Sequence, residues 1–79
     1  MNLMAGFRRT NIQGHTVVAD PELVRQVRRL ASAQLSRLFR EAQEHGQSRV
    51  ELAGKMYTIL RHPDHTFTIG DDRSMSIFA

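Results

Sequence analysis

The stretch PELVRQVRRLASAQLSRLFREAQEH, residues 21–45, predicts one long helix, and the rest of the fold follows from it. Asp20 is a typical N-cap because its side chain can accept from the free amides of the first turn, and Pro21 suits the first helical position. Gly46 comes directly after His45, where glycine readily takes the left-handed conformation that ends a helix. No glycine or proline interrupts the stretch after Pro21. We therefore expect a single helix from about Pro21 to His45.

The apolar side chains of this expected helix form a broad arc. At about 100° per residue, they occupy roughly half of the circumference, which is wider than the stripe that a helix presents to a single surface. These residues are Leu23, Val24, Val27, Leu30, Ala31, Leu35, Leu38, Phe39 and Ala42. The helix is therefore predicted to be central and covered from more than one side.

Segments before and after the helix have the pattern of strands. FRRTNIQGHTVVA predicts a hairpin with its turn between Asn11 and Gly14, and SRVELA, MYTILR and HTFTIG predict an antiparallel meander. In this meander Val50, Leu52, Tyr57 and Ile59 can share one face, and Met56, Leu60, Phe67 and Ile69 the other. The tail SMSIFA, residues 74–79, adds a fourth strand or docks on a partner. The prediction is an α+β fold in a single domain, residues 1–79.

Composition limits the class of protein. At 79 residues the chain is close to the size at which one core is only marginally sufficient, so completion of the core in a homodimer is open, with Ile77 and Phe78 as the candidate contact. The alternative is that this tail is an edge strand of the monomer's own sheet. There is no cysteine, no long apolar run and no apolar signal segment near Met1. We expect a cytoplasmic protein that does not associate with a membrane.

Arginine dominates the positive charge. The formal net charge is +3, and all but Lys55 of the 11 Lys and Arg residues are arginine, which forms forked contacts with phosphates and carboxylates. Codon usage in a GC-rich genome produces the same bias. Opposite the apolar arc lie Arg25, Arg29 and Arg40, with Arg37 at the edge; the span from Arg25 to Arg40 is roughly 20 Å along a continuous helix. This strip is the candidate site for a protein or nucleic-acid partner, and the alternative is an ordinary solvated helix face.

The sequence contains no pattern that indicates catalysis or a bound cofactor. No serine stands in a nucleophile elbow, and no glycine-rich loop precedes a helix. Glu41 and Glu44 each follow an arginine by four residues, which favours ion pairs on a helix surface. His62 and His65 flank Pro63 and Asp64, but a metal site needs further ligands, and Pro-Asp is typical of a turn. We predict no catalytic residue, no cofactor and no metal, and hence no enzyme.

The order of elements (FRRTNIQGHTVVA, then PELVRQVRRLASAQLSRLFREAQEHG, then strands from Ser48 on) resembles that of small phage-encoded inhibitors of bacterial defence, the anti-CRISPR proteins. The resemblance covers the whole chain in size and element order and includes no diagnostic motif. Many such inhibitors are acidic mimics of DNA, whereas this chain is basic. The resemblance implies a stoichiometric binder that occupies a CRISPR surveillance complex and keeps target DNA out.

Three hypotheses of function remain. The leading one is a non-enzymatic inhibitor, from a phage or an accessory element, that occludes a host protein complex. The second is a nonspecific nucleic-acid-binding accessory protein that contacts phosphates through the arginine strip, with affinity that falls steeply with salt. The third is a self-associating structural or assembly component.

Overall fold

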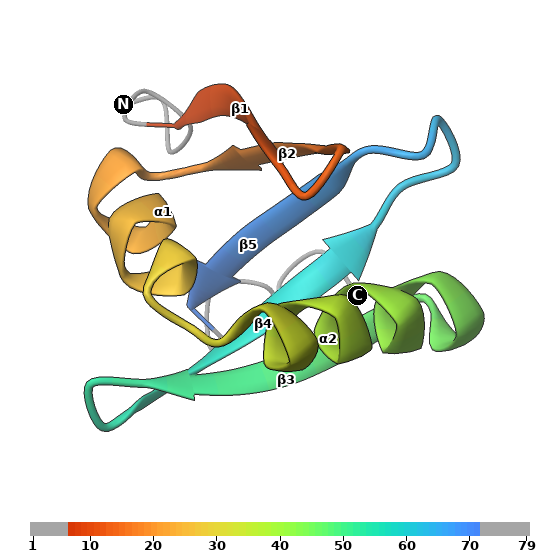
Figure 1. The fold of residues 1–79 in the computed structure, drawn as a ribbon. Helices are drawn as coiled ribbons and strands as arrows, with labels where there is room; N and C mark the ends of the chain where they lie inside the picture. The colour runs from red at the N-terminus through yellow and green to blue at the C-terminus, as the bar shows by residue number, and fades with distance from the viewer. Residues whose placement is uncertain (1–6, 72–79) are drawn as a thin grey trace.

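Two helices pack on one mixed five-stranded sheet in the computed structural model, which describes residues 7–71 (Figure 1). In chain order the elements are β1 (Arg8–Ile12), β2 (His15–Ala19), α1 (Pro21–Arg28), α2 (Ser32–His45), β3 (Gln47–Leu52), β4 (Lys55–Arg61) and β5 (Phe67–Asp71). The α+β class expected from the sequence fits broadly. The tail SMSIFA, with the dimer contact proposed at Ile77 and Phe78, lies outside the described residues.

The expected arrangement of a separate N-terminal hairpin and C-terminal meander is wrong. The strand order is β1-β2-β5-β4-β3, in which β2 and β5 pair in parallel while the other neighbours pair antiparallel. The parallel junction is short, with Val17 opposite Phe67 and Val18 opposite Thr68. Parallel neighbours need a long crossover, and the two helices with β3 and β4 supply it. The strands of the expected hairpin and those of the expected meander thus form one sheet.

The expected single long central helix is also wrong, because the helical stretch breaks between Arg28 and Ser32. The amides of Arg29 and Leu30 donate to the carbonyls three residues earlier, on Gln26 at 3.2 Å and Val27 at 3.0 Å, which closes α1. Ala31 is extended, with φ −61° and ψ 145°. The Leu35 amide then donates to the Ala31 carbonyl at 3.0 Å and opens α2.

The dimensions of the sheet explain this break. A straight helix from Pro21 to His45 would extend over about 37 Å. The strands contain 5–7 residues, which gives lengths of about 17–24 Å. One helix would therefore overhang the sheet, whereas two shorter helices place Leu23, Val27, Leu35 and Leu38 in the same core. The residues of the broad apolar arc are thus divided between two helices, and each helix packs its own apolar side against the same sheet.

Both helices cover the same face of the sheet, and the core lies between them and that face (Figure 1). Ile59 stands opposite Ile69 across the β4–β5 pair, and neither side chain is exposed to solvent. Phe67 and Ile69 therefore share a face with Ile59, and their expected place on the other face with Met56 is wrong. A shift of one residue in register reverses every side chain of a strand, and the apolar pattern across the HPDH turn does not fix that register.

An aromatic cluster joins the two halves of the sheet beneath α2. The ring of His15 stacks on Phe39, with centroids 4.5 Å apart, and meets Phe67 edge-on at 5.3 Å. Phe39 and Phe67 also meet edge-on, at 5.1 Å. The cluster contains one ring each from β2, α2 and β5. It packs directly at the parallel junction, where only two residue pairs hold β2 to β5.

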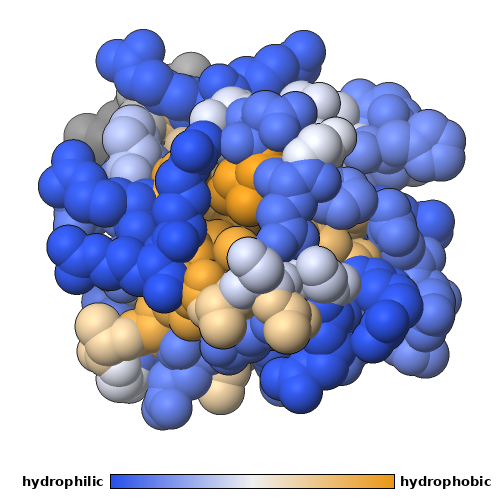
Figure 2. All heavy atoms as spheres, viewed as in Figure 1, coloured by the Kyte–Doolittle hydropathy of each residue, from blue (hydrophilic) through white to orange (hydrophobic). Residues whose placement is uncertain are grey.

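The surface over the helices is mainly hydrophilic, with a smaller hydrophobic area near its centre (Figure 2). Among residues 7–71, Met56 is the exposed large apolar side chain, at 45% of its full accessibility. Gly46 ends α2 in the left-handed conformation with φ 89°, and its amide donates to the Ala42 carbonyl. The chain then enters β3 directly.

Candidate partner-binding surface on the helices

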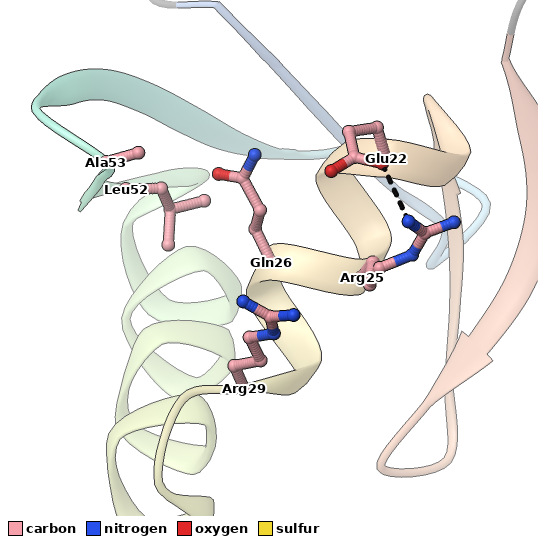
Figure 3. Close-up of a pocket in the computed structure, with 6 residues that line it drawn as sticks. All are labelled: Glu22, Arg25, Gln26, Arg29, Leu52 and Ala53. Atoms are coloured by element: carbon pink, nitrogen blue, oxygen red, sulfur yellow. Dashed lines mark ion pairs between the residues drawn. The ribbon is translucent and has the colours of Figure 1, made fainter.

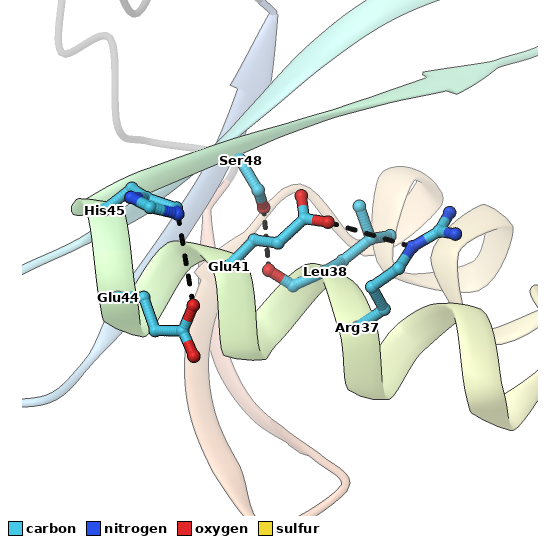
Figure 4. A network of polar contacts seen from close by, with 6 residues as sticks. All are labelled: Arg37, Leu38, Glu41, Glu44, His45 and Ser48. Atoms are coloured by element: carbon cyan, nitrogen blue, oxygen red, sulfur yellow. Dashed lines mark hydrogen bonds and ion pairs between the residues drawn. The ribbon is translucent and has the colours of Figure 1, made fainter.

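Two of the four predicted arginines form exposed ion pairs within their own helices. Arg25 of α1 lies 3.1 Å from Glu22, one turn earlier. Arg37 of α2 lies 3.8 Å from Glu41, one turn later (Figure 4). The two arginines and the two glutamates in these pairs are each about half or more exposed, so the ion pairs contribute little to stability. An acidic group on a partner could therefore replace either glutamate at low cost.

The other two arginines are exposed, and Glu44, which follows Arg40 by four residues, lies 3.9 Å from His45 instead. Arg29 is the residue that caps the C-terminal end of α1, and Arg40 lies in the middle of α2. Within residues 7–71, neither guanidinium forms an ion pair. These two side chains are therefore the cations of the predicted strip that remain available to an acidic group of a partner.

The break after α1 changes the geometry of the strip. Arg25 and Arg29 belong to α1 and its cap, whereas Arg37 and Arg40 belong to α2, and extended Ala31 separates the two groups. The four side chains thus form two pairs on two helices instead of one row along a common axis. The straight span of roughly 20 Å expected along a continuous helix does not exist.

Arg28 has a structural role. Its guanidinium donates to the Thr10 hydroxyl at 3.0 Å and to the Asn11 carbonyl at 2.9 Å, which ties α1 to the edge strand β1. On a helical wheel Arg28 lies at the boundary of the apolar arc, unlike Arg29, but its contact with β1 depends on how β1 lies beside α1, which the sequence does not show.

A hollow beside α1 was not predicted from the sequence. It has a volume of about 310 Å³ and is lined by Glu22, Arg25, Gln26, Arg29, Leu52 and Ala53 (Figure 3). Leu52 is the last residue of β3 and Ala53 follows it in the β3–β4 turn, and both are far from α1 in the sequence. No spacing rule along one helix could have brought these residues together. Two of the predicted arginines, Arg25 and Arg29, nevertheless line it.

Two polar side chains of the HPDH turn, His62 and Asp64, form hydrogen bonds with the threonines that follow the turn. The hydroxyl and the amide of Thr66 donate to the Asp64 carboxylate at 2.6 and 3.1 Å, and these bonds, the hydroxyl first, hold the pKa of Asp64 below its ordinary value. His62 forms a hydrogen bond with the Thr68 hydroxyl. Between residues 7 and 71, no group of three or more His, Cys, Asp or Glu side chains is placed to hold a metal ion.

The comparisons with known proteins leave the geometry as the main source for function. No protein-family model, no curated protein sequence and no solved structure matches the chain. Neither α1 nor α2 combines the length and the apolar character that a membrane crossing requires. The class defined by fold and surface is thus a small α+β protein with two pairs of arginines exposed on its helices.

Proposed function

We propose that the protein is a non-enzymatic inhibitor that binds an acidic surface of a host protein complex through its helices. The observation that carries the proposal is the set of exposed arginines on α1 and α2, of which Arg29 and Arg40 have no ion pair among the described residues. Arginine is the preferred cation for forked contacts with carboxylates at protein interfaces. Arg25 and Arg37 would exchange an exposed internal partner for one on the bound protein.

The arrangement of these charges favours a protein over a nucleic acid as the partner. A duplex backbone presents an unbroken row of phosphates, which a straight row of cations would match. Here the cations stand in two groups on separate helices, and Glu22 and Glu41 lie among them. Carboxylates repel phosphates, whereas a protein surface with both signs of charge can accommodate them.

The particular target that we propose is a CRISPR surveillance complex, and it derives from the resemblance to anti-CRISPR proteins. That resemblance lies in the size of the chain and the order of its elements, and the structure replaces the single helix of that order with two. The proposed mechanism is occlusion: the inhibitor binds an acidic surface beside the path of the target DNA, and its bulk blocks that path, since the basic surface that receives the phosphates would repel its arginines.

The test measures binding of a labelled target duplex to purified surveillance complexes of several types while the protein is titrated in. The helix variant carries Ser at Arg25, Arg29, Arg37 and Arg40. The control variant carries Ser at the exposed residues Arg8, Arg9, Lys55 and Arg61 and has the same loss of charge. We expect near-stoichiometric inhibition by the natural protein and the control variant, and loss of inhibition by the helix variant. Absence of inhibition in every complex would overturn the proposed target.

Binding of a DNA duplex to the protein alone, across a salt series, tests the partner class. The inhibitor proposal predicts no binding at moderate salt. A steep salt dependence that flattens in the helix variant would instead make the protein a phosphate-binding accessory protein. Size measurements over a range of concentrations test self-association, since an assembly component would form concentration-dependent oligomers without an external partner.

A further inference from the structure

The hollow beside α1 brings together hydrogen-bonding groups and an apolar wall. Its volume of about 310 Å³ is at the lower end of the range for ligand pockets, so it can admit one or two residues of a partner but not a large ligand. Leu52, at the end of β3, and Ala53, which follows it, form one side of the hollow, and α1 forms the other (Figure 3).

Arg29 is the cation that faces this hollow without an internal partner. In Figure 3 the guanidinium of Arg25 turns toward Glu22, to which it is paired at 3.1 Å, whereas the guanidinium of Arg29 lies below the carboxamide of Gln26. Arg29 forms no ion pair among residues 7–71. An incoming carboxylate would therefore meet Arg29 first.

Gln26 supplies a second and independent observation. Its Oε1 atom is buried and accepts no hydrogen bond from the described residues. A buried acceptor without a donor destabilises a fold, so each such group in a folded protein requires an explanation, such as a functional role or a bound partner. In Figure 3 this oxygen points toward Ala53 on the opposite side of the hollow, which is the side from which an N–H group of a bound segment would donate.

We propose that the hollow binds an acidic side chain of the partner protein together with a neighbouring backbone N–H group. The proposal rests on the proposed function and names the feature of the partner that α1 recognises. The carboxylate binds Arg29, the N–H donates to Gln26, and the aliphatic part of the bound segment packs on Leu52 and Ala53. A phosphate group fits less well, because it offers no N–H donor and its second charge is repelled by Glu22 at the rim.

The experiment uses two matched peptides and a simple anion as probes. The ¹⁵N-labelled full chain is titrated with acetyl-Ala-Glu-Leu-amide, with acetyl-Ala-Gln-Leu-amide and with inorganic phosphate, and the NMR signals of the Arg29 Nε–H, the Gln26 side-chain amide and the Gly54 amide are followed. The expected result is saturable shifts of all three signals with the Glu peptide, in the millimolar range. The Gln peptide should bind about fivefold or more weakly, since it lacks the charge.

Two single substitutions on exposed positions separate this site from general charge attraction. Arg29→Gln should weaken binding of the Glu peptide by about fivefold or more, whereas Arg61→Gln, at the exposed far end of β4, should leave the affinity of the peptide unchanged. Dispersed amide signals in both variants establish that the fold is intact. Equal binding of the two peptides, equal loss in the two variants, or equal shifts with phosphate would each overturn the proposal.

The outcome is separable from that of the proposed function. If the Glu peptide fails to bind while the helix variant still loses inhibition, the inhibitor contacts its target through other parts of the helices and the hollow is not the anchor. If the Glu peptide binds at Arg29 and no surveillance complex is inhibited, the acidic-segment site stands and the target is a different protein.

Discussion

Ser48 is the residue whose side chain joins the sheet directly to α2. Its hydroxyl donates to the Leu38 carbonyl at 2.8 Å, and the residue is buried (Figure 4). We expect Ser48→Ala to lower the free energy of unfolding by about 1–2 kcal/mol, because a buried hydrogen bond is lost without replacement. Urea denaturation followed by circular dichroism measures this difference. Ser36→Ala, which removes an exposed bond to Gln13, is the control and should change stability by less than about 0.5 kcal/mol; equal effects would contradict the prediction.

The pKa of Asp64 depends mainly on one hydroxyl group. Thr66→Val removes that hydroxyl and keeps the Thr66 amide, so the pKa should rise but remain below the ordinary value. Thr66→Ser retains a hydroxyl and should leave the pKa low. Carboxyl NMR signals recorded across an acid titration measure both variants. A pKa in the valine variant equal to that of the natural protein would show that the hydroxyl is not the cause.

The pH dependence of stability at this turn has a definite sign. A carboxylate whose pKa is depressed in the folded state stabilises the fold above the pKa of the unfolded chain, near 3.9 for Asp. This contribution is lost as the pH falls through the folded-state value. The natural protein should therefore lose stability in acid from this turn, and the valine variant should lose less.

At the scale of elements, the break between the helices provides a test of the fold. Ser32 is the first residue of α2, a position that proline favours, and Ala31 before it has the extended conformation that a residue preceding proline requires. Ser32→Pro should therefore be neutral or raise stability by up to about 1 kcal/mol. A continuous helix would lose about 3 kcal/mol or more from the same change.

Ser36→Pro is the matched control for this experiment, because Ser36 lies inside α2 on an equally exposed position. It should destabilise the protein by about 3 kcal/mol or more, or prevent folding. Thermal unfolding of both variants decides the matter. Similar losses in the two proline variants would mean that the helix continues through Ser32 in solution.

Local signals in the sequence were sufficient for the ends of the helical stretch but not for its middle. The Asp20 side chain accepts from the Glu22 amide at 2.9 Å, and Gly46 closes α2, so α1 starts at Pro21 and α2 ends at His45. Helix caps can be predicted from a sequence because they depend on residues that are close together along the chain. The break at Ala31 has no such signal, because alanine favours a continuous helix and the size of the sheet overrides it.

The candidate site was predictable to a similar degree. Exposure of Arg25, Arg29, Arg37 and Arg40 follows from the helical period, since they lie opposite the apolar positions. Their division into two pairs depends on the break, and the hollow depends on the turn at Ala53, which a helical wheel cannot include. The role of Gln26 could not be predicted for the same reason, because the lack of a hydrogen-bond donor for its Oε1 atom depends on the residues packed around it.

At the scale of the whole molecule, the parallel junction makes one unit of two halves. β1, β2 and α1 reach the rest of the sheet through two residue pairs between β2 and β5, and the aromatic cluster of His15, Phe39 and Phe67 packs across this seam. Phe67 is almost completely buried and contributes to both the strand pairing and the cluster. We infer that the halves fold cooperatively because neither has a complete core alone.

Phe67→Leu tests this inference. The smaller side chain should lower the free energy of unfolding by about 1–2 kcal/mol through lost packing, yet leave the fold intact. In a cooperative unit, the urea midpoint reported by Tyr57 fluorescence in β4 and that reported by Val17 methyl signals in β2 should fall together. Ile59→Val, at an equally buried site within β4, is the control for loss of packing away from the seam and should also give one shared midpoint. If Val17 reported unfolding at lower urea than Tyr57 in the leucine variant, the two halves would be separate units, and the seam would be a docking contact instead of a shared core.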